Sequence, residues 1–200
     1  MREDCPRSGS LAGTAKAIHH GADDNASGTT ALIELARRFA ADKDRQGRRL
    51  VFVAFAGEEM GLLGSKHFVE HPPVPLESTV AMVNMDMVGR LADDPTSGKG
   101  KLEIGGTGSA KEFDALVDKL NAKHQFDVKK NKSGVGPSDH TSFYLKGVPV
   151  FFLFTGLHRQ YHKPADTVDR IEPQEVSKAA ASLAAMIYVV ADMPQPLPKM

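Results

Sequence analysis

Residues 50–59 read LVFVAFAGEE, an unbroken apolar run that ends in a glycine and two glutamates. The run is rich in β-branched and aromatic side chains, which is typical of a strand buried on both faces, as in parallel sheets. In open α/β sheets, ligand sites lie beyond the carboxyl ends of the strands. We therefore expect the pair Glu58-Glu59 to lie at a functional edge of a sheet.

Apolar strands and amphipathic helices alternate along the rest of the chain. Further strands are predicted at 79–88, 101–104, 126–129 and 149–154, and helices at 27–41, 62–69, 109–124, 138–146 and 173–191. This alternation predicts an α/β fold, a three-layer α/β/α sandwich around a mostly parallel mixed sheet. Residues 1–200 are interpreted as one domain, with an irregular start over 1–20 and a Pro-rich tail over 193–200.

The composition excludes several classes of function. The chain has 25 basic and 25 acidic residues and no polybasic run, so nucleic acid is not an expected partner. The apolar runs are too short to span a bilayer, and the first residues lack the apolar segment of a signal peptide. The single cysteine, Cys5, excludes an intramolecular disulfide and a cysteine-rich zinc site. The 8 histidines and the many carboxylates leave a His/carboxylate metal site open.

Other polar residues are expected at the same edge as the two glutamates. Asp23 precedes the first predicted helix, Asp86 lies near the end of strand 79–88, and His162 follows strand 149–154. An isolated glutamate pair is usually a solvated turn, but carboxylates and imidazole together form the usual ligand set of a hydrolytic zinc site. One glutamate can then bind the metal while its neighbour accepts a proton from water.

Several motifs resemble, in order and spacing, those of the M28 family of zinc metallopeptidases. They are GADDNASG (21–28), AGEEMGLLGS (56–65), NMDMVGR (84–90), SDH (138–140), GLH (156–158) and YHKPADT (161–167). The resemblance runs from about residue 8 to residue 187. It implies a zinc-dependent peptidase, with aminopeptidase activity on peptide substrates as the leading expectation. It also implies a periplasmic or extracellular location.

The resemblance assigns roles to individual residues. Glu58 is similar to the general base, and Tyr161 to the phenol that polarises the scissile carbonyl or stabilises the oxyanion. Asp23 is similar to the carboxylate that bridges two zinc ions, and a cis peptide bond is expected between Asp23 and Asp24. The remaining ligands would be Glu59 and His162 on one ion and Asp86 on the other. The residues expected around them, in a second shell or in the pocket, are Asp24, Asp139, His140, His158 and Asp166. For Asp166 two roles are open: to orient His162, or to stabilise a helix cap or turn.

One ligand of the family has no counterpart in the sequence. It is a histidine at the end of an earlier strand, and by motif order it would fall at or before Met1. The resemblance therefore implies that the chain corresponds to the C-terminal two-thirds of a catalytic domain, without its N-terminal strands. The site of Asp23, Glu59 and His162 would be complete, whereas the second site would keep only Asp23 and Asp86. Peptidase activity of this polypeptide is then expected to be impaired, and exposed sheet edges would favour pairing with another chain.

Two other functions remain open from the sequence. Glutaminyl cyclases of the same superfamily keep a single zinc ion with one Asp, one Glu and one His. Alternatively, the chain is a non-catalytic remnant that serves as an interaction module. Zinc content separates the three hypotheses: two ions per chain support the peptidase, one supports a cyclase or an impaired peptidase, and none supports the remnant. The sequence predicts no oligomeric state.

Overall fold

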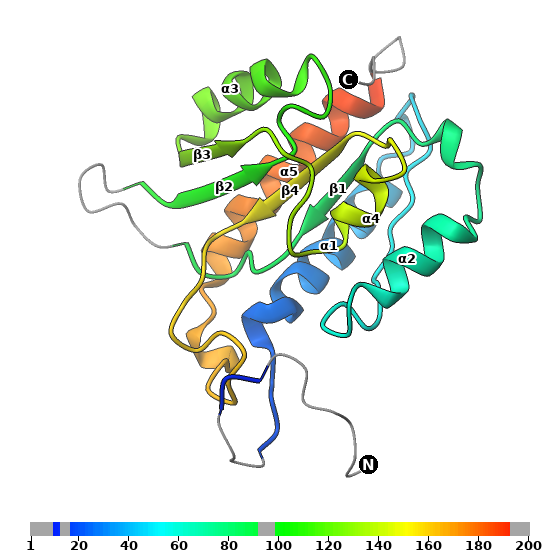
Figure 1. Ribbon diagram of the computed structural model, residues 1–200. Coiled ribbons are helices and arrows are strands. Elements are labelled where there is room, and N and C mark those ends of the chain that lie inside the picture. The colour runs from blue at the N-terminus through cyan, green and yellow to red at the C-terminus, as the bar shows by residue number, and fades with distance from the viewer. Residues whose placement is uncertain (1–9, 13–16, 92–98, 193–200) are drawn as a thin grey trace.

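A mixed sheet lies at the centre of the molecule. The protein is described here by a computed structural model that covers residues 10–12, 17–91 and 99–192. Within these residues the sheet has the strand order β1-β4-β2-β3 (Figure 1). The strands are β1 (Met82–Met85), β2 (Lys101–Gly105), β3 (Asp127–Asn131) and β4 (Val150–Phe154). The pairs β1–β4 and β2–β3 are parallel, whereas β2 and β4 run antiparallel.

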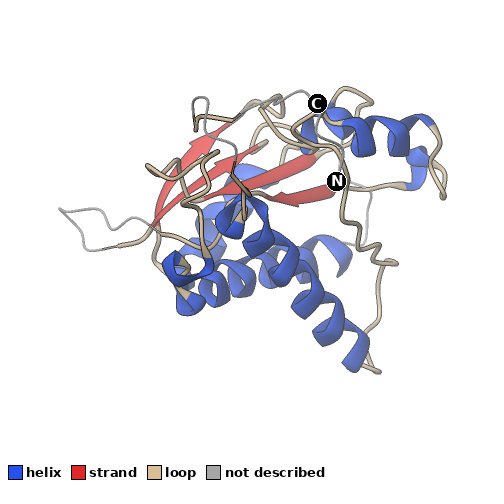
Figure 2. Ribbon diagram, turned by 90° about the horizontal axis from the view of Figure 1, so that it is seen from below, coloured by secondary structure: helices blue, strands red, loops and turns tan. Residues whose placement is uncertain are grey.

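Helices cover both faces of this sheet, as Figures 1 and 2 show. One face carries α1 (Gly28–Ala41), α3 (Phe113–His124) and α5 (Pro173–Asp192), and the other carries α2 (Leu63–Glu70) and α4 (His140–Tyr144). The short helical turns are η1 (Ala22–Ser27), η2 (Leu76–Ser78) and η3 (Val168–Arg170). The predicted three-layer α/β/α sandwich with a mixed sheet is confirmed.

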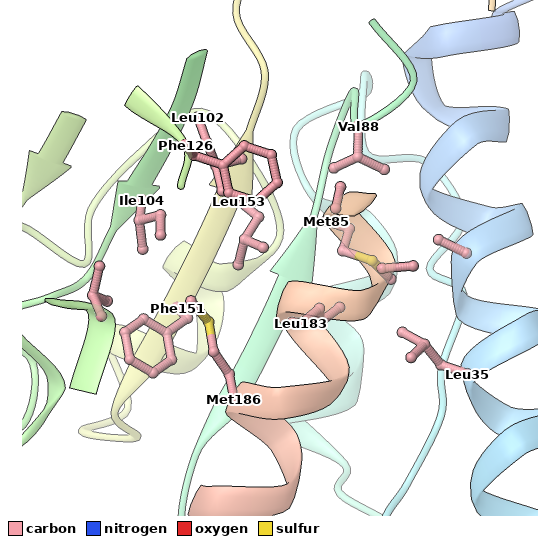
Figure 3. Packing of buried hydrophobic residues seen from close by; sticks show 14 of the residues in the cluster. Leu35, Met85, Val88, Leu102, Ile104, Phe126, Phe151, Leu153, Leu183 and Met186 are labelled. Atoms are coloured by element: carbon pink, nitrogen blue, oxygen red, sulfur yellow. The ribbon is translucent and has the colours of Figure 1, made fainter. Parts of the chain in front are cut away.

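The larger part of the core lies between the sheet and the helices α1, α3 and α5. Phe151 and Leu153 of the central strand β4 are fully buried on this face, where Leu183 and Met186 of α5 pack against the sheet (Figure 3). The ring of Phe151 stacks on that of Phe113 with centroids 3.9 Å apart. Burial of each such side chain stabilises the fold by about 2–3 kcal/mol. The apolar run of β4 is thus explained by its central position between two layers of helices.

The predicted strand over 50–56 is not part of the sheet, so this prediction was wrong. Residues 51–55 form no ladder and make no backbone hydrogen bond with any described residue. Val51 is 53% exposed. The apolar pattern was correct for a strand, but a strand also needs a hydrogen-bonded neighbour. The described residues include no strand that is hydrogen-bonded to β1 on the side away from β4. Phe55 instead packs its ring near Phe68 and Phe143, with centroids 5.6 and 5.9 Å apart.

The other predicted elements are confirmed with shifted ends. The strand expected over 79–88 pairs only at Met82–Met85, and the helix expected from residue 109 begins at Phe113. The predicted tail (193–200) lies outside the described residues, as does most of the irregular start (1–20). Among the described residues, none of the helices combines the length and the apolar character that a bilayer crossing requires.

Candidate metal centre

Three side chains from three separate loops meet beside the sheet. Asp24 precedes α1, Glu59 precedes α2, and His162 follows β4. Each offers one ligand atom, and the three atoms lie within 4.8 Å of one another. His162 Nε2 is 3.1 Å from Asp24 Oδ2 and 2.9 Å from Glu59 Oε1. One imidazole and two carboxylates are the donor set of a hydrolytic zinc site with three protein ligands.

Negative charge is crowded around these ligands. Burial, together with the charges of Asp86 and Glu59, raises the pKa of Asp24 to about 7. Burial likewise raises the pKa of Glu58 to about 8, again with a contribution from Asp86. The pKa of Asp86 is raised to about 6 by burial, although the Ser138 hydroxyl donates to its Oδ2 at 2.7 Å and opposes the shift. A bound cation would relieve this repulsion, so the residues fit a divalent metal ion.

The structure places Asp24, and not Asp23, beside Glu59 and His162, which corrects the expected assignment. Asp23 is fully buried, and its carboxylate is turned inward. The N–H of Gly89 donates to its Oδ1 at 2.8 Å, and His158 Nε2 lies 3.3 Å from its Oδ2. Only one of the two aspartates faces the ligands because the Gly89 amide holds the side chain of Asp23. The cis peptide bond also lies one residue later than expected, between Asp24 and Asn25.

The two glutamates and Asp86 line one cleft. Its volume is about 210 Å³, and its walls include Asp24, Glu58, Glu59 and Asp86. Asp86 follows β1, where its N–H donates to Leu153 O at 3.1 Å. It lines this cleft without belonging to the close group of three donor atoms.

Tyr161 lies directly against the histidine of the centre. Its ring stacks on that of His162 with centroids 3.8 Å apart. Burial, reinforced by the charge of Asp24, raises the pKa of Tyr161 to about 12, so the hydroxyl keeps its proton at neutral pH. The backbone of His162 has φ 54°, a left-handed conformation that non-glycine residues adopt rarely and mostly under a local constraint.

Asn25 fixes the loop that carries Asp24 to the end of β1. Its Nδ2 donates to Met85 O at 2.9 Å, and its Oδ1 accepts from Met87 N at 3.2 Å and from Gly28 N at 3.1 Å. Gly28 is required here because a Cβ would lie 2.9 Å from Met85 O. Sequence reasoning missed Asn25, although asparagine side chains commonly bond to backbone groups in turns and this one stands inside a quoted motif.

Asp166 contacts the same loop from the other side. Of the roles open for Asp166, orienting His162 was one; its carboxylate instead accepts hydrogen bonds from the backbone N–H of Asp23, at 3.1 Å from each oxygen, and of Asp24, at 3.0 Å. Asp166 is 2% exposed. It therefore acts on the aspartate loop.

Three other residues were expected in the surroundings of the centre, namely Asp139, His140 and His158. His140 is buried with its ring stacked 4.3 Å from that of Phe152, and burial lowers its pKa to about 4. Asp139 lines the cleft, and burial raises its pKa. His158 contacts Asp23, as described above, and burial lowers its pKa, with a further contribution from Arg90.

The chain is similar to several known aminopeptidases. It is 30% identical over 177 residues to aminopeptidase YwaD of Bacillus subtilis, which covers 84% of this chain and 37% of that protein. It is 28% identical over 186 residues to a probable leucine aminopeptidase of Arthroderma otae, covering 88% of this chain and 50% of that protein. The chain therefore spans half or less of the length of these relatives.

Solved structures and a family model agree with this similarity. The zinc aminopeptidase BSAP from Bacillus subtilis superimposes with a TM-score of 0.71 at 26% identity, over 91% of this chain and 46% of that one. The model of peptidase family M28 matches residues 10–187, nearly the whole described region and all three loops of the metal centre. The chain belongs to peptidase family M28.

Proposed function

We propose that this chain belongs to a zinc-dependent aminopeptidase that hydrolyses the first peptide bond of its substrate. The observation that carries the proposal is the convergence of Asp24, Glu59 and His162 within 4.8 Å, with the cleft beside them lined by Glu58. The names of the relatives support the choice of an aminopeptidase. The acidic cleft would also attract the positively charged amino terminus of a peptide.

We assign zinc to the site of Asp24, Glu59 and His162, in which Asp24 would be the aspartate ligand first expected at Asp23. Bound zinc would supply Lewis acidity, which makes water more acidic and polarises a peptide carbonyl. Asp24 and Asp86, which line the same cleft, would hold a second ion. With two protein ligands among the described residues, that second site is expected to be the weaker one.

Glu58 moves the proton in this proposal. Its carboxylate takes a proton from the water whose oxygen attacks the carbonyl carbon, and then gives that proton to the nitrogen of the leaving amine as the C–N bond breaks. The pKa near 8 describes Glu58 without a cation nearby; a positive charge in the cleft would favour the carboxylate form that a base needs. Tyr161 donates its O–H to the carbonyl oxygen as negative charge develops there.

Substitution of Glu58 tests this assignment directly. Glu58→Gln should lower hydrolysis of a leucine anilide by about 10²–10⁴-fold, because the amide cannot accept the proton. Zinc uptake, measured on the same preparation, should stay near that of the wild type because Glu58 is not a ligand. If the wild type hydrolyses the anilide and the variant does so equally well, the role of Glu58 is wrong.

A single-zinc enzyme of the glutaminyl cyclase type is the second candidate. It is favoured by one observation: the close donor group contains one Asp, one Glu and one His, and Asp86 stands apart from it. Cyclisation of an amino-terminal glutamine peptide without anilide hydrolysis would support it, and absence of zinc uptake would support a non-catalytic chain. The resemblance alone supports a periplasmic or extracellular location, which cell fractionation tests.

A further inference from the structure

Two loops of the metal centre are joined by the carboxylate of Asp166. One loop, before α1, carries Asp24, and the other, after β4, carries His162 and, four residues later, Asp166 itself. Figure 1 shows the two segments close together beyond the same end of the sheet. Their contact is made by backbone as well as side chain, since Ala22 N donates to Asp166 O at 3.2 Å.

The carboxylate of Asp166 accepts hydrogen bonds from two consecutive backbone amides. Oδ1 and Oδ2 both accept from Asp23 N at 3.1 Å, and Oδ2 also accepts from Asp24 N at 3.0 Å. With 2% of its surface exposed, Asp166 has little access to water, so these N–H groups provide its solvation. Hydrogen bonds to a buried charge are stronger than neutral ones, and here they fix the peptide plane from which the side chain of Asp24 projects.

We propose that Asp166 is a positioning residue for the metal centre, which holds Asp24 at the correct distance from His162 before a metal ion arrives. The proposal rests on the proposed function, since it concerns the zinc affinity of the same site. The hydrogen bonds from Asp166 fix the backbone at Asp23 and Asp24. On the C-terminal side of Asp24, the side chain of Asn25 is hydrogen-bonded to Met85 O of β1. Asp24 therefore enters the site with its backbone anchored on both sides, and its side chain loses little freedom when it binds a cation.

Zinc affinity of Asp166 variants tests this role. Competition with a colorimetric zinc chelator should show that Asp166→Ala binds zinc about 10–100-fold more weakly than the wild type, the range found for partners that orient metal ligands. The zinc affinity of Asp166→Asn should lie between those of the wild type and Asp166→Ala, because a single carbonyl oxygen at the position of Oδ2 can still accept from both amides. Asp169→Asn, on the exposed surface of η3, controls for the loss of a carboxylate in the same segment.

A core variant separates positioning from general destabilisation. Val117→Ala shortens a buried side chain of α3, remote from the loops, and should lower the free energy of unfolding without changing zinc affinity. If Val117→Ala weakens zinc binding as much as Asp166→Ala at equal loss of stability, Asp166 has only a structural role. Equal zinc affinity of the wild type and Asp166→Ala would also overturn the proposal.

Hydrogen exchange keeps the test independent of the proposed function. In the metal-free protein, the amides of Asp23 and Asp24 should exchange at least about tenfold faster in Asp166→Ala than in the wild type, because they lose their acceptor. Unchanged exchange of the peptide 21–27 would refute the hydrogen bonds between Asp166 and the amides of Asp23 and Asp24, independently of any result on zinc binding. A wild type that takes up no zinc, but shows this change in exchange, would refute the proposed function and the metal-positioning role while leaving the contact itself established.

Discussion

Replacing Asp24 by asparagine should stabilise the metal-free protein at alkaline pH. The variant keeps the size of the side chain but cannot ionise. In the folded chain, burial and the neighbouring carboxylates raise the pKa of Asp24 from its ordinary 3.8 to about 7. A carboxyl with a raised folded-state pKa favours folding below pH 4, where it is protonated in both states, and this contribution is lost as the pH rises toward 7. At pH 8 the wild type therefore carries a cost that Asp24→Asn avoids.

The size of this cost follows from the shift in pKa. About three pKa units correspond to about 4 kcal/mol, of which about 2.5 kcal/mol develops between pH 5 and pH 8. Solvent at the open side of the cleft and redistribution of protons among Asp24, Glu58 and Asp86 reduce the effect. We therefore expect the difference in free energy of unfolding between variant and wild type to widen by about 1–2 kcal/mol over this range.

Urea unfolding at pH 5 and pH 8, with a metal chelator present, measures this difference. Asp44→Asn, on the exposed loop after α1, is the control for removing a carboxylate elsewhere. A difference that is the same at both pH values would refute the inference that burial and the neighbouring carboxylates raise the pKa of Asp24. With zinc at 100 times its Kd the advantage of the variant at pH 8 should shrink, because binding stabilises the wild type by about 2.7 kcal/mol and the variant lacks one ligand.

Three further predictions concern the core, the unpaired segment and the cleft. Phe151→Ala should lower the free energy of unfolding by about 3–5 kcal/mol in urea, because it empties a fully buried site against Phe113; a loss below about 1 kcal/mol would contradict this packing. Val51→Lys should reduce self-association in analytical ultracentrifugation without loss of stability, since Val51 is 53% exposed beside an unpaired backbone; unchanged association would show that this segment is not the contact. Ser138→Ala should raise the pKa of Asp86 further, because Asp86 loses its 2.7 Å hydrogen-bond donor, and should therefore weaken zinc binding below pH 7. A pH profile of zinc affinity identical to that of the wild type would show that this hydrogen bond does not contribute to zinc binding.

Much of the architecture could be predicted from local pattern. The helix from Gly28 and the strand Val150–Phe154 follow from apolar periodicity and length, because such elements bury faces that their own residues define. The three loops of the metal centre were predicted from motif order, and Asp24, Glu59 and His162 do converge. The assignment of a functional loop thus needed only residues close together in sequence.

Contacts between distant residues decided the rest. Asp23 and Asp24 are chemically identical neighbours. The amide of Gly89, 66 residues away in sequence, donates a hydrogen bond to the side chain of Asp23, whereas the side chain of Asp24 faces Glu59 and His162. The run 50–56 has the composition of a buried strand, yet strand pairing is a property of two segments, and the described residues offer it no partner. Asp166 could not be assigned from its motif because its partners, the amides of Asp23 and Asp24, lie more than 140 residues away. Hydrogen bonds of this kind depend on which loops the folded chain brings together, and the local sequence around either partner does not specify that.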